Sequence, residues 1–217
     1  AQAVLEPAPA FTPATATRVF TLTMADLAAF LLVPRLAARL AREAPGVELR
    51  VRPAPDDTVG ALASGELDLA IGVYGDAPAG ARTHRLWDEA FACVIRRARG
   101  ARPLDLDAYL ARAHVVVAPR GRPGSAIDEL LARRGQARRI AITVPHFLVA
   151  PAIVASTELV WTAPMSLARA FAATYPLAIH PPPLPVAGFT LSTRWHARFD
   201  RDPGLAWLRG VIAELAP

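Results

Sequence analysis

The feature of this sequence that most restricts its fold is a regular alternation of strand-like and helix-like segments. Apolar and polar residues alternate over residues 18–24, as in a strand, and helical spacing follows over residues 34–44. Pro34 is compatible with that helix because proline is tolerated in a first helical turn. The next segments are a strand at 47–51, a helix at 58–64 and an almost wholly apolar strand at 67–73. Because near-continuous apolar strands are typical of buried parallel sheets, this order predicts a wound α/β sheet.

The second half of the chain repeats the pattern. Strands are expected at 90–96, 114–118, 139–144, 159–162 and 189–196, and helices at 125–134, 147–156, 166–174 and 203–215. The run Pro181-Pro182-Pro183 indicates a stiff crossing before the last strand. The simplest architecture is two α/β lobes joined by two crossings. Residues 18–92 with 189–215 form lobe I, residues 93–188, crossings included, form lobe II, and the Pro-rich residues 1–17 are expected to be a linker.

Composition and charge exclude several classes of protein. With 53% hydrophobic and 20% charged residues, the chain fits a soluble protein with a real core. The formal net charge of +5 comes from arginines interleaved with acids rather than from a basic stripe. The densest cluster is interpreted as a solvated helix end and comprises Arg133, Arg134, Arg138 and Arg139. No run approaches the ~18 apolar residues of a membrane helix, and the first residues lack the layout of a signal peptide, so a cytoplasmic protein is expected.

No pattern in the sequence predicts catalysis, a metal or a cofactor. The five histidines never pair at i, i+4, and Ser125 lies outside any G-x-S-x-G elbow. The single cysteine, Cys93, excludes an internal disulfide and a cysteine-based metal cluster. Cys93 is interpreted as a buried small hydrophobe rather than a redox sensor, and Trp161 and Phe171 as core residues. The sequence therefore favours a binding module over an enzyme.

Several segments resemble the effector-binding domain of LysR-type transcriptional regulators. They are FTLTMADLAAFLLVPRLAARLAREAPGVELRV at 20–51, LASGELDLAIG at 62–72, LWDEAFACVIRRARG at 86–100, VPHFLVAPAIVASTELVWTAP at 144–164 and the closing W…R…DPGLAWLRGVI at 195–212. Together they extend over roughly residues 18–215. Within the family, FTLTMAD and VPHF…ASTELV resemble the subgroup of regulators of aromatic-acid catabolism and flavonoid-responsive nodulation.

The resemblance implies a two-lobed fold of the type-2 periplasmic-binding-protein kind and a single effector-binding domain overall. It implies a small organic effector, with an aromatic or other carboxylate as a candidate, bound in the cleft between the lobes. It also implies a homodimer or homotetramer that contacts DNA only through an N-terminal helix-turn-helix, which no segment of this chain provides. An extracytoplasmic solute-binding protein of the same fold is the alternative, and an enzyme built on that fold is a further rival.

Eight residues at strand ends and helix starts are expected to line the effector site, where ligands of α/β folds bind. They are Met24, Ala25, Asp26, Leu27, Pro55, Asp56, His146 and Phe147. The family places the turn after the first strand and the loop after the second strand at the effector, and the subgroup resemblance adds the histidine. The subgroup often carries a hydroxyl at the position of Ala25, where this chain has none.

Three of these residues have a second interpretation. Asp26 is suited to cap the helix that follows it, and Asp56 to supply a favourable acid at the next helix start. If both acids cap, a carboxylate effector is acceptable, whereas acids that project into the site favour a neutral or cationic one. His146 is either a surface residue or a hydrogen-bond donor to a carboxylate or phenolate.

Overall fold

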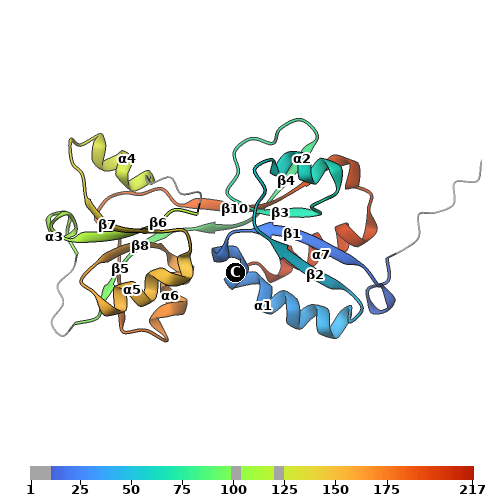
Figure 1. The fold of residues 1–217 in the computed structure, drawn as a ribbon, viewed down its shortest axis with the longest axis horizontal. Coiled ribbons are helices and arrows are strands. Elements are labelled where there is room, and N and C mark those ends of the chain that lie inside the picture. Colours follow the sequence, from blue (N-terminus) through green and yellow to red (C-terminus); the bar gives the residue numbers. More distant parts are fainter. Residues whose placement is uncertain (1–10, 99–103, 120–124) are drawn as a thin grey trace, which may run out of the picture. The chain divides into compact units, whose positions relative to one another are not determined.

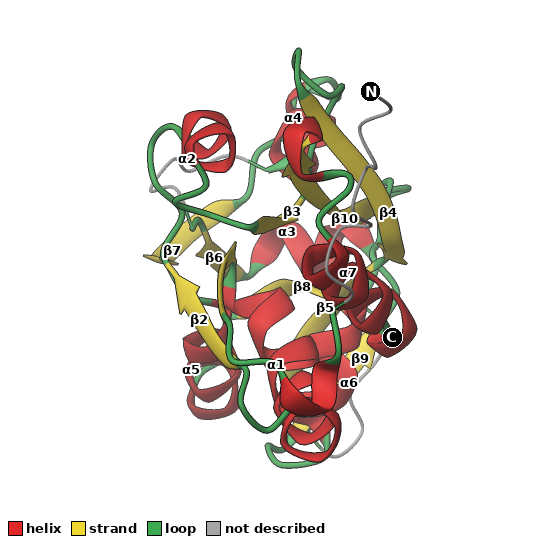
Figure 2. Cartoon of the chain, turned by 90° about the vertical axis from the view of Figure 1, so that its right-hand side faces the viewer, coloured by secondary structure: helices red, strands yellow, loops and turns green. Residues whose placement is uncertain are grey.

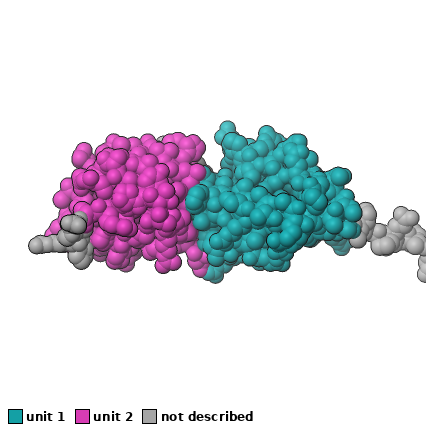
Figure 3. Space-filling view, turned by 90° about the horizontal axis from the view of Figure 1, so that it is seen from below, with its two compact units in different colours: residues 1–87, 190–217 teal, residues 88–189 magenta. Residues whose placement is uncertain are grey.

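A computed structural model describes residues 11–98, 104–119 and 125–217 (Figure 1). The chain divides into two compact units, Ala1–Trp87 with Thr190–Pro217 (unit 1) and Asp88–Phe189 (unit 2) (Figure 3). The chain therefore crosses between the units twice. The first boundary lies earlier than the predicted one after Ala92. The reason is that the strand beginning at Phe91 pairs only with strands of unit 2 among the described residues.

Unit 1 contains one five-stranded sheet with the strand order β2-β1-β3-β10-β4. Its strands are β1 (Val19–Met24), β2 (Glu48–Arg52), β3 (Leu69–Gly72), β4 (Ala81–Glu89) and β10 (Phe189–His196). Strand β1 is parallel to both β2 and β3, while β10 runs antiparallel to β3. The helices are α1 (Asp26–Glu43), α2 (Thr58–Ser64) and α7 (Pro203–Leu215), with 3-10 turns η1 (Pro13–Thr15) and η3 (Ala197–Phe199). Figure 2 shows α1 and α2 on opposite sides of this sheet.

Unit 2 repeats the arrangement with the strand order β7-β6-β8-β5-β9. Its strands are β5 (Phe91–Arg96), β6 (Ala113–Val117), β7 (Arg139–Val144), β8 (Val160–Pro164) and β9 (Leu177–His180). Strand β6 is parallel to β7 and β8, and β5 is antiparallel to β8. The helices are α3 (Leu106–Ala111), α4 (Ala126–Ala132), α5 (Ala150–Ser156) and α6 (Met165–Ala172), with a 3-10 turn η2 (Phe147–Val149). The predicted two-lobed α/β fold is confirmed.

Helix α1 contradicts the prediction that a helix begins at Pro34. It begins at Asp26, and Pro34 lies inside it. Proline in a helix interior removes one backbone hydrogen bond and costs about 3 kcal/mol. The apolar stripe of α1 offsets this cost, because each fully buried leucine contributes about 1.5–3 kcal/mol. The leucines of that stripe are Leu27, Leu32, Leu36 and Leu40, all buried.

The segment just before β1 is not the linker that the proline content predicts. Residues 1–10 of the expected linker lie outside the described residues. Phe11, by contrast, lies in unit 1, with its ring centroid 5.2 Å from that of Trp207 and 6.2 Å from that of Phe20. A Cβ atom at Gly204 would lie 2.9 Å from the Phe11 ring. The missing side chain of Gly204 is what admits the phenylalanine.

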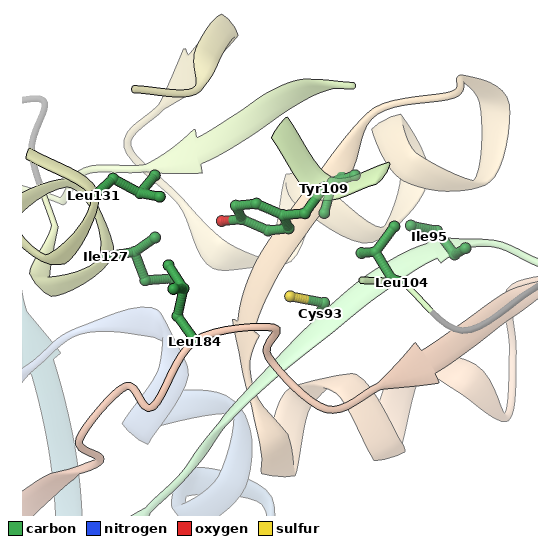
Figure 4. Close-up of a cluster of buried hydrophobic side chains, with 8 residues drawn as sticks. Cys93, Ile95, Leu104, Tyr109, Ile127, Leu131 and Leu184 are labelled. Carbon is green, nitrogen blue, oxygen red and sulfur yellow. The ribbon is translucent and has the colours of Figure 1, made fainter. Parts of the chain in front are cut away.

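The core of unit 2 includes a cluster around Cys93 and Tyr109 (Figure 4). Cys93 is fully buried, as the sequence suggests, and burial raises the pKa of its thiol to about 11. Trp161 is also a core residue at 1% exposure. A thiol that stays protonated is a poor nucleophile, which is consistent with a purely structural role.

One arginine of the predicted surface cluster is buried instead. Arg133, Arg134 and Arg139 are exposed, but the Arg138 side chain is 2% exposed. Its guanidinium donates to Asp128 at 2.7 Å and to the Tyr109 hydroxyl at 2.9 Å. Burial opposes the charge of Arg138, but these hydrogen bonds outweigh it, so the pKa of Arg138 is raised. The prediction that Arg138 is a solvated surface residue is wrong. Its partner Asp128 lies ten residues earlier, on α4, so the arginine cluster alone does not reveal the pair.

Candidate functional site

The carboxyl ends of the three parallel strands of unit 1 meet at one edge of its sheet. Strand β1 lies in the middle, and Thr23 is in register with Arg52 of β2 on one side and with Ala70 of β3 on the other. Neighbouring strands lie about 4.8 Å apart, so the segments that follow them are close together. This edge is where α/β sheets bind ligands.

The turn between β1 and α1 lies at that edge. Ala25 is the N-cap residue of α1, is exposed and makes no side-chain cap hydrogen bond. The prediction that Asp26 is the N-cap is therefore wrong, since Asp26 is the first helical residue, one position later. The first N–H groups of a helix lack intrahelical partners and carry partial positive charge, so this turn is suited to an anion.

Two of the four predicted residues in this turn point into unit 1 rather than to its surface. Met24 is 9% exposed and Leu27 is 4% exposed, so both belong to the core. Ala25 is exposed and Asp26 is half-buried. At this turn Ala25 and Asp26 lie nearer the surface, and Met24 and Leu27 pack beneath them.

Thr23, directly before this turn, is a polar residue that the sequence reasoning missed. It is 2% exposed, and its Oγ1 has no hydrogen-bond partner among the residues that the structure describes. An unpaired buried hydroxyl costs about 1–3 kcal/mol. Such groups are rare in folded proteins and call for an explanation. Thr23 is the second-to-last residue of β1, and only its burial in the folded unit, which no pattern in the sequence shows, identifies it.

The loop after β2 presents the second pair of predicted residues. Pro55 is half-buried and Asp56 is exposed. Asp57, rather than Asp56, caps α2 by accepting a hydrogen bond from the Gly60 N–H at 2.8 Å. The capping function is thus filled by the next residue, which leaves the Asp56 side chain at the surface of the same loop.

In unit 2 the predicted pair His146 and Phe147 follows β7. His146 is exposed, is the N-cap residue of η2 and makes no side-chain cap hydrogen bond. Phe147 is half-buried, and the next two residues, Leu148 and Val149, are each 44% exposed. A titratable donor therefore lies beside a small apolar surface.

In unit 2, a side chain of the protein itself binds an N–H group at the start of helix α6. The Glu89 carboxylate accepts hydrogen bonds from the Ser166 N–H at 2.9 Å and from the Ser166 hydroxyl at 2.6 Å. Glu89 is 4% exposed. The start of α6 thus already holds a carboxylate of the chain itself, whereas the N-cap residue of α1 supplies no such group.

Residues 11–98, 104–119 and 125–217 contain no group of three or more His, Cys, Asp or Glu side chains arranged to hold a metal ion. Within the same ranges, no helix has both the length and the apolar character needed to cross a membrane.

Comparisons with known proteins identify the family. Residues 14–217 match the model of the LysR substrate binding domain. The chain is 31% identical to the HTH-type transcriptional activator NagR of a Ralstonia species, covering 99% of this chain and 72% of NagR. It is 32% identical to Nodulation protein D 1 of Rhizobium tropici, covering 95% of this chain and 68% of that protein.

A solved structure agrees with this assignment. The regulatory domain of MexT, a transcriptional activator in Pseudomonas aeruginosa, superposes with a TM-score of 0.80 at 33% identity, covering 93% of this chain and 99% of that domain. The relatives are transcription regulators rather than solute-binding proteins or enzymes, in line with the predicted subgroup. The chain belongs to the LysR substrate binding domain family and is the effector-binding domain of a LysR-type transcriptional regulator.

Proposed function

We propose that this domain recognises a small aromatic carboxylate and that the start of α1 binds its carboxylate group. The observation that carries the proposal is an exposed helix start, whose N-cap residue is an alanine, next to the buried hydroxyl of Thr23 two residues earlier, which has no hydrogen-bond partner within residues 11–98, 104–119 and 125–217. An anion at this position gains hydrogen bonds from backbone N–H groups and the favourable end of the helix dipole. The hydroxyl of Thr23 gains the partner that it lacks.

The remaining predicted residues supply the other contacts in this proposal. In unit 1, Pro55 and Asp56 present the loop after β2. In unit 2, His146 donates a hydrogen bond and Phe147 offers apolar surface. Met24 and Leu27 do not contact the ligand in this proposal. Both are buried, and their packing fixes the position of the β1–α1 turn. Asp26 favours the helix start but repels an anion, so it lowers the affinity for a carboxylate.

We also propose that the domain forms a homodimer or a homotetramer through its edge strands. Strands β2 and β7 are edge strands of their sheets. Each exposes large apolar side chains, with Val51 of β2 at 39%, Ile140 of β7 at 37% and Ile142 at 38% exposure. An exposed edge with apolar side chains invites pairing with another chain. Sedimentation at micromolar concentration should reveal a species heavier than 23.1 kDa.

In the complete regulator, we propose that effector binding controls DNA binding by an N-terminal helix-turn-helix and that the protein acts in the cytoplasm, without catalysis. The family membership supports this, and the chain spans 72% of the length of NagR. An effector regulates only if it binds two states of the protein with different affinity.

Calorimetric titration of the 217-residue chain tests the ligand class. Benzoate and benzamide form a matched pair, since they share the ring and differ in charge. Binding of benzoate at least tenfold tighter than benzamide supports a helix-start anion site. Equal or weaker binding of benzoate contradicts it and favours a neutral effector.

A further inference from the structure

The strand order of unit 1 places a third loop at the proposed carboxylate site. After β1 the chain passes through α1 to β2, on one side of β1. After β3 it runs to β4, at the opposite edge of the sheet. The connections that leave β1 and β3 therefore diverge, and ligands of wound sheets bind where adjacent strands have such diverging connections. The sequence reasoning considered the loops after β1 and β2 but not the loop after β3.

The first residue of that loop is Val73. In the parallel register Met24 is the partner of Ile71, so Gly72 follows beside Ala25 and Val73 comes next. The three residues Leu69, Ala70 and Ile71 are buried, whereas Val73 is 55% exposed. Among the described residues, a large apolar side chain is thus exposed one residue beyond the strand end that adjoins the start of α1.

A buried cation fixes the loop that carries Val73. Arg194 of β10 is 7% exposed. Its Nη2 atom donates to the carbonyl oxygens of Gly75 at 2.9 Å and Asp76 at 3.2 Å. Its Nε atom donates to the Thr83 hydroxyl at 3.0 Å. The guanidinium therefore ties residues 75 and 76 to both β10 and β4.

Tyr74 also holds this loop in place. The Arg194 Cζ atom lies 4.2 Å from the centroid of the Tyr74 ring, at a distance typical of a cation–π contact. Tyr74 also packs against a cluster that includes Ala61 and Leu62 of α2. A Cβ atom at Gly72 would lie 3.2 Å from the Tyr74 hydroxyl, so the ring closes over the end of β3. With its neighbour held in this way, Val73 is presented in a fixed position, and preorganised contacts cost little entropy on binding.

We propose that Val73 determines effector specificity by contacting the aromatic part of the ligand, and that Arg194 is the positioning residue of its loop. The inference rests on the proposed function, because it assumes a ligand whose carboxylate lies at the start of α1. The ring of such a ligand then adjoins the loop after β3. Val73 favours larger apolar rings, because the apolar area that they bury grows with ring size.

The test compares Val73→Thr with Val19→Thr by calorimetric titration with benzoate and 2-naphthoate. Threonine has nearly the shape of valine, and Val19, 39% exposed, lies at the opposite end of β1 and serves as the matched control. We expect Val73→Thr to weaken 2-naphthoate binding about tenfold and benzoate binding less, as an altered apolar contact does. Val19→Thr should leave both affinities unchanged.

Each other outcome has a definite meaning. If wild-type protein binds neither acid, the proposed ligand class fails and this inference fails with it. If wild type binds but Val73→Thr changes neither affinity, or changes both by the same factor, only the specificity assignment is overturned.

A second pair of variants tests the positioning residue. Lysine retains the charge of Arg194 but lacks the planar fork that reaches two carbonyls and the ring together. Arg194→Lys should weaken 2-naphthoate binding more than benzoate binding, as Val73→Thr does, and should speed amide hydrogen exchange in residues 73–76. Arg82→Lys, at an exposed ion pair with Asp200, should do neither. Unchanged affinities in Arg194→Lys together with faster exchange would show that the loop does not contact the ligand.

Discussion

The Nε atom of Arg138 lies 2.7 Å from the Oδ1 atom of Asp128, and this ion pair joins the residue just before β7 to α4. Asp128 also accepts hydrogen bonds from the N–H and the hydroxyl of Ser125, at 2.8 and 2.9 Å. Burial alone would raise the pKa of Asp128, but the contact with Arg138 lowers it below its ordinary value. The carboxylate therefore both caps α4 and neutralises a buried cation.

Removing that carboxylate should strongly destabilise unit 2. In Asp128→Asn the buried guanidinium of Arg138 loses its counter-charge, and breaking a buried pair typically costs about 3–5 kcal/mol. Urea unfolding at pH 7 measures the loss. Glu158→Gln is the control, since the ion pair of Glu158 with Arg96 is exposed and should contribute less than about 1 kcal/mol. Equal losses of unfolding free energy in the two variants would contradict the prediction that the buried pair stabilises unit 2 more than the exposed pair does.

Stability should fall as the pH drops from 6.5 to 4, partly because of His114. Burial lowers the pKa of His114 to about 4, while its Nε2 atom donates to the Tyr109 carbonyl at 2.9 Å. Arg138 also lowers this pKa and Asp128 opposes it. The unfolded chain, with a histidine pKa near 6.5, binds a proton in this window before the folded chain does. Stability therefore rises with pH across it, by up to about 3 kcal/mol.

Urea unfolding of wild type and His114→Gln at pH 7 and pH 5 isolates this contribution. Carboxylates titrate in both proteins, so the difference between their pH dependences belongs to His114. We expect wild type to lose more stability than the variant between the two pH values. A variant that loses as much as wild type would mean that His114 titrates normally in the folded protein.

Replacing His146 by alanine should weaken binding of a carboxylate effector by about 1–3 kcal/mol, the usual effect of losing a hydrogen bond to a charged group. Titration with benzoate provides the measurement. His84→Ala is the control, because His84 is also exposed but lies on β4 of unit 1. Unchanged affinity in His146→Ala would remove this residue from the site.

Thr23→Val should stabilise the free domain and weaken its binding of benzoate. Valine fills the same volume without the unpaired hydroxyl, so the free energy of unfolding should rise by about 1 kcal/mol. Opposite changes in stability and affinity distinguish a ligand-binding group from a structural one. If Thr23→Val lowers stability instead, the hydroxyl has a partner within the protein.

The sequence predicted the fold well wherever hydrophobic periodicity was unbroken. The bounds of α2, β7, β10 and α7 agree with the predicted segments. Strand β4 was missed because it is an edge strand with four consecutive exposed residues and little apolar alternation. For α1 the helical spacing predicted only the part from Pro34 onward, and Asp26, expected as the cap, is one residue beyond the actual N-cap, Ala25.

The candidate site was less predictable because it depends on register between strands. Sequence motifs identified the turn at Ala25 and the loop at Asp56, which lie at the same sheet edge. They could not separate Asp56 from Asp57 as the cap of α2, since both precede the helix. Thr23 is identified only by its burial within β1, and Val73 only by its exposure just beyond the end of the neighbouring strand β3. The periodicity of a single strand reveals neither property.

Backbone amide shifts of the isotope-labelled domain during titration with benzoate test the central claim most directly. The account predicts that the largest changes occur in residues 25–28, at the start of α1, because those N–H groups meet the carboxylate. Smaller changes should follow in residues 55, 56 and 73. Shifts confined to the opposite edge of the sheet, near residues 19 and 48, or absent from the start of α1, would contradict it.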